Sequence, residues 1–284
     1  MTWSTLVVGT GYVGQRFLAQ QSTETAIGLS RSSVPSPHQI ETCDLDAGGQ
    51  FPVPLPDHYG VLYTVPPSSD HESDVRLERL LGDLSPAPQR FVYISTTGVY
   101  GNRDGGLVDE ETPVNPETGR AKRRIAAEQA LLAWGKQHDC EILVLRVPGI
   151  YGPERLGVER IREGLPVLAE NDTGPGNRIH VDDLVACCAA ALAQHAPAGI
   201  YNVGDGDDRS STWFTNELAR QSHLPAPPTI SMKDAEREFS PMRMSFLRES
   251  RRVSTQKMRD SLGVTLRYSN AVDGIAASLS ESPL

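Results

Sequence analysis

The stretch LVVGTGYVGQRFL, residues 6–18, decides the fold class of this chain. A run of apolar residues is followed by Gly9, Gly11 and Gly14 in the spacing G-x-G-x-x-G, and then by residues with helical periodicity. Glycines at these places allow a tight turn, let the backbone approach a pyrophosphate and let the helix pack on the strand. The helix N-terminus would add amide donors to the anion. Because the motif directly follows a strand, it favours a dinucleotide-binding loop over a purely structural turn.

Outward from this loop, short apolar segments alternate with longer segments of helical period, which is the pattern of βαβ units around a parallel sheet. The predicted strands are 4–9, 25–30, 38–45, 60–65, 90–96, 141–147 and 199–204. The predicted helices are 12–21, 71–84, 120–137, 182–195 and 211–222. We therefore expect an α/β fold with a doubly wound parallel sheet, the Rossmann fold. The expected domains are a dinucleotide-binding domain at 1–147 and a mixed region at 148–284. Within the mixed region, 148–177 and 205–250 form a small substrate-binding lid, and the remainder returns to the Rossmann core.

The composition restricts the possible partners. The chain has 284 residues, a formal net charge of -9 and 38% hydrophobic residues. An acidic chain offers no overall basic surface to nucleic-acid phosphates, and no stretch has the pattern of a signal peptide or a membrane span. We expect a cytoplasmic protein that binds a small-molecule substrate, with no nucleic-acid or membrane partner. The cysteines form no CxxC pair, which predicts buried free thiols and no metal site; they are Cys43, Cys140, Cys187 and Cys188.

The end of the second predicted strand, GLSRSS, bears on which dinucleotide is bound. A ribose 2'-hydroxyl is usually met here by an acidic residue and a 2'-phosphate by a basic one. Arg31, flanked by Ser30 and Ser32, favours NADP, with NAD as the second possibility; a solvated loop arginine is the alternative. After the third strand, Asp44 precedes Leu45, and its carboxylate either accepts a hydrogen bond from the adenine amine or caps a turn.

Further motifs follow the glycine loop in order: YISTTGVYG (93–101), VDEETPVNP (108–116), LRVPGIYGP (145–153), NRIHVDDLVACCAAAL (177–192) and GIYNVGDG (199–206). With these motifs the chain resembles the extended branch of the short-chain dehydrogenase/reductase superfamily, the NAD(P)-dependent epimerases and dehydratases. The resemblance covers nearly the whole length. It implies an NADP-dependent oxidoreductase acting on a small or sugar-like carbonyl or alcohol substrate. The alternative is a non-catalytic NADP-binding sensor or scaffold protein.

Members of this family commonly use a Ser or Thr, a Tyr and, one helical turn later, a Lys that binds the nicotinamide ribose and lowers the pKa of the phenol. The resemblance places Thr96 at the first of these positions and Lys122 at the last. Thr118 then stands where the tyrosine would be, and an aliphatic hydroxyl is too weak an acid to relay a proton as a phenol does. The expected active site is therefore divergent. An exposed lysine in a basic turn is the alternative for Lys122.

The resemblance also implies the other walls of the site. Further cofactor contacts are expected from the glycine loop and from the ends of two strands, at Tyr12, Val13, Val65, Pro66, Pro148, Gly149 and Ile150. Substrate contacts are expected from Thr97, Tyr151, Arg178 and His180. Asp74 is expected to pair with Lys122 or a nearby water. Tyr100 and Tyr151 are either packed in the core or able to replace the missing proton donor.

Overall fold

The computed structural model describes residues 4–48 and 51–281, and within them the largest sheet has seven strands, all parallel, in the order β11-β7-β5-β4-β1-β2-β3. These strands are β1 (Thr5–Val8), β2 (Ala26–Ser30), β3 (Ile40–Thr42), β4 (Gly60–Tyr63), β5 (Arg90–Thr96), β7 (Glu141–Val147) and β11 (Gly199–Asn202). The chain direction across the sheet reverses between β3 and β4, as in a doubly wound sheet. Each of the strands lies within a segment that the sequence predicts. The predicted fold class is confirmed.

Helices cover both faces of the sheet, because successive side chains of a strand point to opposite faces. On β1, Leu6 and Val8 belong to one buried core, and Val7 belongs to the other. The core that contains Leu6 and Val8 lies under α2 (Val75–Asp83) and α3 (Gly119–Gln137). The core that contains Val7 lies under α1 (Tyr12–Ala19) and α5 (Val181–Leu192). Buried on both faces, the strands hold the loops at their carboxyl ends in fixed positions.

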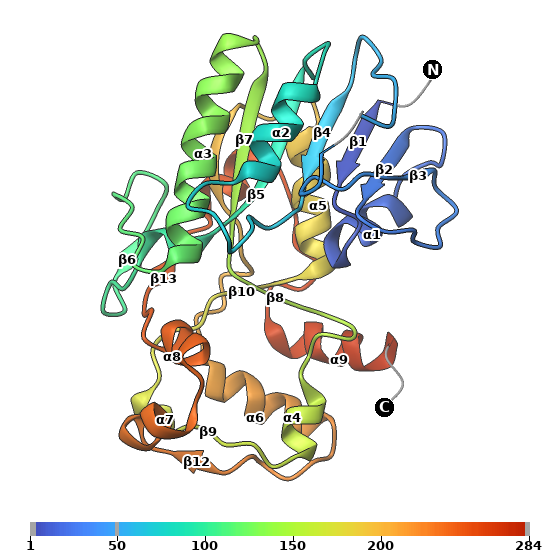
Figure 1. The fold of residues 1–284 in the computed structure, drawn as a ribbon. Helices are drawn as coiled ribbons and strands as arrows, with labels where there is room; N and C mark the ends of the chain where they lie inside the picture. Colours follow the sequence, from blue (N-terminus) through green and yellow to red (C-terminus); the bar gives the residue numbers. More distant parts are fainter. Residues whose placement is uncertain (1–3, 49–50, 282–284) are drawn as a thin grey trace.

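A smaller lobe lies below the sheet in Figure 1 and has apolar clusters of its own. In one cluster Ile161 packs with Leu218, and in the other Leu168 packs with Phe239 and Met244. The elements of this lobe are α4 (Val158–Arg162), β9 (Val167–Leu168), η2 (Glu170–Asp172), α6 (Ser211–Gln221), β12 (Thr229–Ile230), α7 (Met232–Glu238) and α8 (Pro241–Leu247).

Short elements join the two lobes. Two-stranded parallel pairs form between β8 and β10 and between β6 and β13. The remaining elements are η1 (Thr97–Tyr100), β6 (Leu107–Val108), β8 (Gly149–Tyr151), β10 (Arg178–His180), β13 (Arg252–Val253), the π-helix η3 (Met258–Leu262) and α9 (Ala271–Glu281). These pairs connect segments that are far apart in the chain, since β8 pairs with β10 and β13 pairs with β6.

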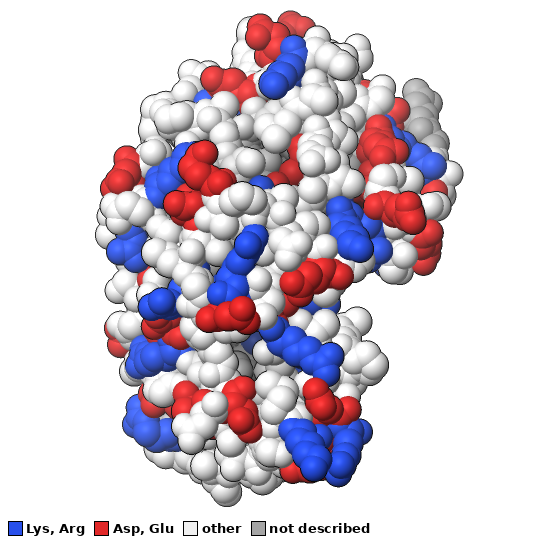
Figure 2. Space-filling model, turned by 90° about the vertical axis from the view of Figure 1, so that its left-hand side faces the viewer, with Lys and Arg blue, Asp and Glu red and all other residues white. Residues whose placement is uncertain are grey.

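The surface carries charges of both signs. On the face shown in Figure 2, Lys and Arg side chains alternate with Asp and Glu side chains over both lobes. Across residues 4–48 and 51–281, no helix is long and apolar enough to cross a bilayer.

Candidate functional site

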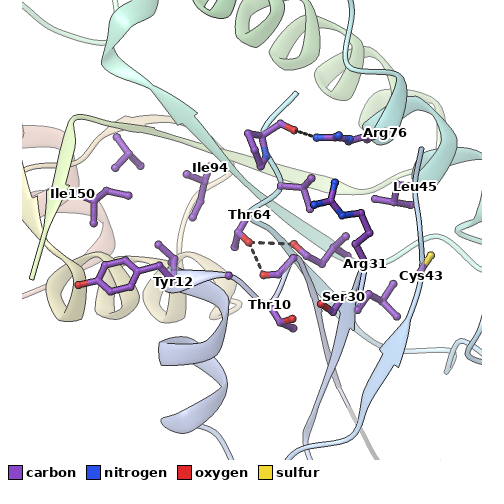
Figure 3. A pocket seen from close by; sticks show the side chains of 18 of the residues that line it. Thr10, Tyr12, Ser30, Arg31, Cys43, Leu45, Thr64, Arg76, Ile94 and Ile150 are labelled. Carbon is purple, nitrogen blue, oxygen red and sulfur yellow. Dashed lines mark hydrogen bonds between the residues drawn. The ribbon is translucent and has the colours of Figure 1, made fainter. Parts of the chain in front are cut away.

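The carboxyl ends of the parallel strands surround a cavity of about 790 Å³, which we call the sheet-edge cavity (Figure 3). Ligands of open α/β sheets bind at this edge, where the strand order reverses. Many of the predicted site residues line the cavity: Gly9, Gly11, Tyr12, Val13, Ser30, Arg31, Ser32, Asp44, Leu45, Val65, Pro66, Thr96, Pro148 and Ile150. The residues that follow β1, β2, β3, β4 and β7 thus meet in one place, as the sequence predicts.

The glycine loop has the geometry that close backbone approach requires. Gly9 has a φ of +95°, and its carbonyl accepts a hydrogen bond from the Thr64 hydroxyl at 2.6 Å. A Cβ on Gly14 would lie 2.0 Å from the Gly9 carbonyl oxygen, so this glycine lets α1 pack against the strand. A Cβ on Gly11, by contrast, would meet no described atom within 4 Å. The space beside Gly11 is therefore open for a ligand.

The end of β2 brings an arginine into the cavity. Arg31 is exposed and lines it, and Figure 3 shows its side chain among those of Ser30, Leu45 and Thr64. A carboxylate that the sequence analysis did not expect, Asp46, lines the same region. Arg76 donates two hydrogen bonds to Asp46, at 2.7 and 2.6 Å, and this pairing holds the pKa of the carboxyl below its usual range. Among the described residues at this end of the cavity, Arg31 is therefore the cation left for a ligand.

Asp44 has the capping role that the sequence left open for it. Its Oδ1 accepts a hydrogen bond from the backbone N–H of Asp46 at 2.9 Å, which is the geometry of an Asx turn. The side chain still lines the sheet-edge cavity beside Leu45. Turn capping does not use Oδ2, so contact with a ligand and capping are compatible at this residue.

A second cavity, of about 380 Å³, lies between the sheet and the small lobe, and we call it the interlobe cavity. Thr96 and Pro148 line both cavities, so the two meet there. The Thr96 hydroxyl oxygen accepts a hydrogen bond from the backbone N–H of Gly98 at 3.1 Å, and the hydroxyl hydrogen remains for donation into the site. The predicted residues Thr97 and Gly149 line the interlobe cavity.

Helix α3 presents different residues to the site from those that the sequence analysis chose. Lys122 is exposed and lines neither cavity. Thr118 is the N-cap of α3, and its side chain accepts a hydrogen bond from the Ala121 N–H at 3.3 Å. Instead, Arg124 lines the sheet-edge cavity and Arg120 lines the interlobe cavity. Thr118 and Lys122, expected at the reacting centre, lie about 200° around the helix from Arg120 and Arg124, which line the cavities.

Arg124 is held at the end of β5. Its Nη1 donates to the Tyr93 hydroxyl at 3.0 Å and to the Ile94 carbonyl at 2.8 Å. Asp74, which was expected to pair with Lys122 or a nearby water, caps α2 by accepting a hydrogen bond from the Leu77 N–H at 3.2 Å. Burial raises the pKa of Asp74, and the nearby charge of Arg124 acts in the opposite direction. Asp74 thus neighbours the arginine that faces the cavity.

Three of the predicted substrate contacts are buried outside both cavities. Arg178 forms an ion pair with Asp207 at 3.4 Å. Burial lowers the pKa of His180 to about 4, and its Nδ1 accepts from the Asp182 N–H at 3.2 Å while Nε2 lies 3.1 Å from the Ser278 hydroxyl. Tyr151 packs edge-on against the His180 ring. These side chains connect β8, β10 and α5, and Arg178 also lines a smaller cavity of about 200 Å³ that shares Pro148 with the two larger ones.

A buried polar network lies beneath the site. Arg146 on β7 donates to both carboxylate oxygens of Glu128 on α3, at 3.3 and 2.8 Å, and Glu128 also accepts from the Ser95 hydroxyl. Arg146 Nη1 donates to the Tyr100 hydroxyl at 2.9 Å, which donates to Asn202 Oδ1 at 2.8 Å. Burial raises the pKa of Tyr100. Tyr100 is therefore a packed core residue, the first of the two roles considered for it.

The cysteines are free thiols, and three of them are buried. Cys43 differs from the expectation of a buried thiol, because it is half-buried and lines the sheet-edge cavity. Partial burial raises its pKa above the ordinary thiol value. The thiol is thus predominantly protonated at neutral pH.

Several residues that line the cavities were missed by the sequence analysis. Those of the sheet-edge cavity include Thr10, Thr64, Arg76, Ser95, Arg124 and Arg155, and those of the interlobe cavity include Arg120, Asn177, Phe246, Glu249 and Arg251. Thr10 and Thr64 adjoin predicted residues and could have been inferred from their position at strand ends. Glu249 and Arg251 could not, since the segment before them has no clear periodicity.

The fold and the site together define a doubly wound α/β protein with a glycine-rich anion-binding loop at the carboxyl edge of its sheet. The model of the NAD dependent epimerase/dehydratase family matches residues 66–204. This matched segment, from just after β4 to just after β11, is what the chain shares with that family.

Known proteins share parts of this sequence and all of this fold. The chain is 33% identical to dTDP-glucose 4,6-dehydratase of Streptomyces niveus over 144 residues. The aligned region covers 46% of this chain and 40% of that relative. The match thus spans about two fifths of that relative's length. A conserved protein of unknown function from Silicibacter pomeroyi is 30% identical over the whole of both chains, with a TM-score of 0.80. The structure of MoeE5 with UDP-glucose and NAD is 19% identical, with a TM-score of 0.77 over 98% of this chain and 97% of that one, a similarity of fold.

Proposed function

We propose that this protein is an NADP-dependent oxidoreductase that acts on a small or sugar-like carbonyl or alcohol substrate. The observation that carries the proposal is the sheet-edge cavity, in which an open glycine loop and Arg31, at the ends of the adjacent strands β1 and β2, line the same space. A volume of about 790 Å³ falls within the range of cavities that hold cofactors. The match of residues 66–204 to the NAD dependent epimerase/dehydratase family supports the part of the proposal that concerns a dinucleotide-dependent enzyme.

The residues present fit a dinucleotide. The pyrophosphate would lie against Gly11, where no side chain fills the space, at the first turn of α1. The amide groups of a first helical turn have no partner within the helix and donate readily to an anion. Val65 and Pro66 after β4, and Pro148 and Ile150 after β7, give the cavity apolar walls.

The preference for NADP is proposed from the charges near the end of β2. A 2'-phosphate would meet Arg31 together with the hydroxyls of Ser30 and Ser32. The carboxylate of Asp46 is already paired with Arg76, so its repulsion of a phosphate is reduced. The neutral 2'-hydroxyl of NAD would gain less from the charge of Arg31 than a 2'-phosphate would.

When it is bound, the nicotinamide supplies or accepts the hydride. The chain's own part is to hold the reacting groups: Arg124 would bind the ribose next to the ring, and the Thr96 hydroxyl would donate to the substrate oxygen. Arg120 and Arg124 are four residues apart, which is the spacing of the tyrosine and lysine in active members of the resembled family. A guanidinium stabilises a developing oxyanion by its charge but does not release a proton near neutral pH.

Titration of intrinsic fluorescence with NADP and with NAD tests the proposal. We expect tighter binding of NADP, and we expect Arg31→Ala to weaken NADP binding by about 10- to 100-fold without changing NAD binding. Arg237→Ala, which removes an exposed arginine of α7, is the matched control. Equal affinities for the two dinucleotides, or an equal effect of the two variants, would refute the preference.

The second candidate function is a non-catalytic NADP-binding sensor or scaffold. It is favoured by Arg120 and Arg124, whose guanidinium groups face the cavities from α3. In active members of the resembled family, a tyrosine and a lysine at this spacing support proton transfer. Absorbance of NADPH at 340 nm separates the two, because an oxidoreductase consumes NADPH with a carbonyl substrate and a sensor only binds it.

A further inference from the structure

The interlobe cavity contains a small cluster of charges that reaches it from both lobes. Arg120 comes from α3, and Glu249 and Arg251 come from the segment after α8. Among the described residues that line the cavity, these three are the charged ones, two cations and one anion. Their charges leave one positive charge in excess.

Arg120 is positioned by three contacts. Its guanidinium lies over the Phe246 ring, 3.7 Å from the centroid. Nη1 donates to the Ser245 hydroxyl at 3.0 Å, and Nη2 lies 3.4 Å from Glu249 Oε1. The contact with Glu249 is at the long end of hydrogen-bond distances, and a guanidinium has five N–H donors. Arg120 therefore has donors left for a further anion.

Glu249 is occupied mainly by the other arginine. Arg251 Nη2 donates to Glu249 Oε2 at 3.0 Å, and these side chains are only 8% and 7% exposed. Arg251 Nη1 donates to the Gly101 carbonyl at 2.8 Å. The Arg251 Nε is buried and has no partner in the part of the chain that the structure describes. The pair of Glu249 and Arg251 is thus a fixed, nearly neutral wall, and Arg120 is the more exposed cation, at 34%.

The space beyond this cavity has the opposite charge. An open outer cavity shares Thr173, Gly174 and Leu247 with the interlobe cavity. It is lined by Asp104, Glu117 and Asp172, and its one described arginine, Arg248, is paired with Glu236 at 2.8 Å. A nucleotide diphosphate that extended from the interlobe cavity into this space would meet uncompensated carboxylates.

We propose that the interlobe cavity binds a small substrate with one anionic group, a carboxylate or a phosphate monoester, held by Arg120. The proposal rests on the proposed function, since the reacting carbon would lie beside Thr96, where the two cavities meet. The single excess positive charge matches one anionic group, and about 380 Å³ is near the lower limit of ligand cavities. The acidic outer cavity disfavours a nucleotide sugar.

Isothermal titration of the NADP-saturated protein tests this assignment with three probes: glycolate for a carboxylate, inorganic phosphate for a phosphate, and UDP-glucose for a nucleotide sugar. We expect glycolate or phosphate to bind and UDP-glucose to bind more weakly than either. Arg120→Gln should weaken the binding of the anion by about tenfold or more, the loss expected for one charge-assisted hydrogen bond. Arg120→Lys should lose less, because the charge is kept.

Lys136→Gln, which removes a cation from the far end of α3, is the control and should change nothing. Binding that Arg120→Gln leaves unaltered, or tighter binding of UDP-glucose than of both anions, would overturn the proposal. The same titrations without NADP distinguish the two levels of inference. Anion binding that depends on Arg120 in a protein that does not bind NADP would overturn the proposed function and keep the anion site.

Discussion

Replacing Arg124 with Gln should weaken the binding of NADP, and the same replacement at Lys122 should not. Both residues are cations of the first turns of α3, but Arg124 lines the sheet-edge cavity and Lys122 is exposed outside it. Arg124 is already held by the Ile94 carbonyl at 2.8 Å, so little side-chain freedom is lost when a ligand binds.

The size of the effect follows from the bond that is removed. A hydrogen bond to a charged group contributes about 1.5 to 3 kcal/mol, and about 1.4 kcal/mol corresponds to a tenfold change in Kd. Arg124→Gln should therefore raise the Kd of NADP by about 10- to 100-fold. Glutamine keeps an amide donor for the end of β5, so the melting temperature should fall by only a few degrees.

Fluorescence titration of the two variants with NADP is the assay, with thermal unfolding as the check on folding. The comparison is controlled within one helix, since each variant removes one positive charge from the same two turns. If Lys122→Gln weakened NADP binding as much as Arg124→Gln, the assignment of the cavity-facing side of α3 would be wrong.

Three further perturbations test other parts of the site. Gly11→Val should abolish NADP binding and leave the circular dichroism spectrum unchanged, because the new Cβ enters open space. Thr118→Tyr should remove the α3 cap, cost about 1 kcal/mol in denaturant unfolding and give no gain in NADPH oxidation, which a phenol at the reacting centre would produce. Asp205 lies buried just after β11, and burial raises its pKa from 3.8 to about 7, so its contribution to stability is lost as the pH rises through this window. Asp205→Asn should therefore stabilise the protein at pH 8 relative to wild type and not at pH 4; equal effects at both would contradict the shift.

The sheet was predictable because its strands are short apolar runs whose residues are buried on both faces. Leu6, Val7 and Val8 show this for β1, which packs into both cores. The small lobe was not predictable in the same way, because strands as short as Val167–Leu168 and helices as short as Val158–Arg162 leave no periodicity to detect. The predicted division at residue 147 stays a prediction.

The walls of the sheet-edge cavity were predictable because they follow directly from strand ends. The side of α3 that faces the site was not. The family pattern was aligned on Lys122, and a shift of two residues along a helix turns a side chain by about 200°. Arg120 and Arg124 were read as parts of a solvated basic turn, although their four-residue spacing fits a single helix face.

The ion pair of Glu128 with Arg146 fixes which side of α3 faces the two cavities. Glu128 lies one turn after Arg124 and two turns after Arg120, and both members of the pair are almost completely buried. Leaving one member of a buried pair without its partner costs about 3 to 5 kcal/mol, so α3 can neither rotate nor slide against the sheet. Helix α3 therefore keeps its position whichever side chains stand at positions 120 and 124. Substitution of Arg120 and Arg124 would therefore exchange the chemistry offered to both cavities without displacing the support that carries it.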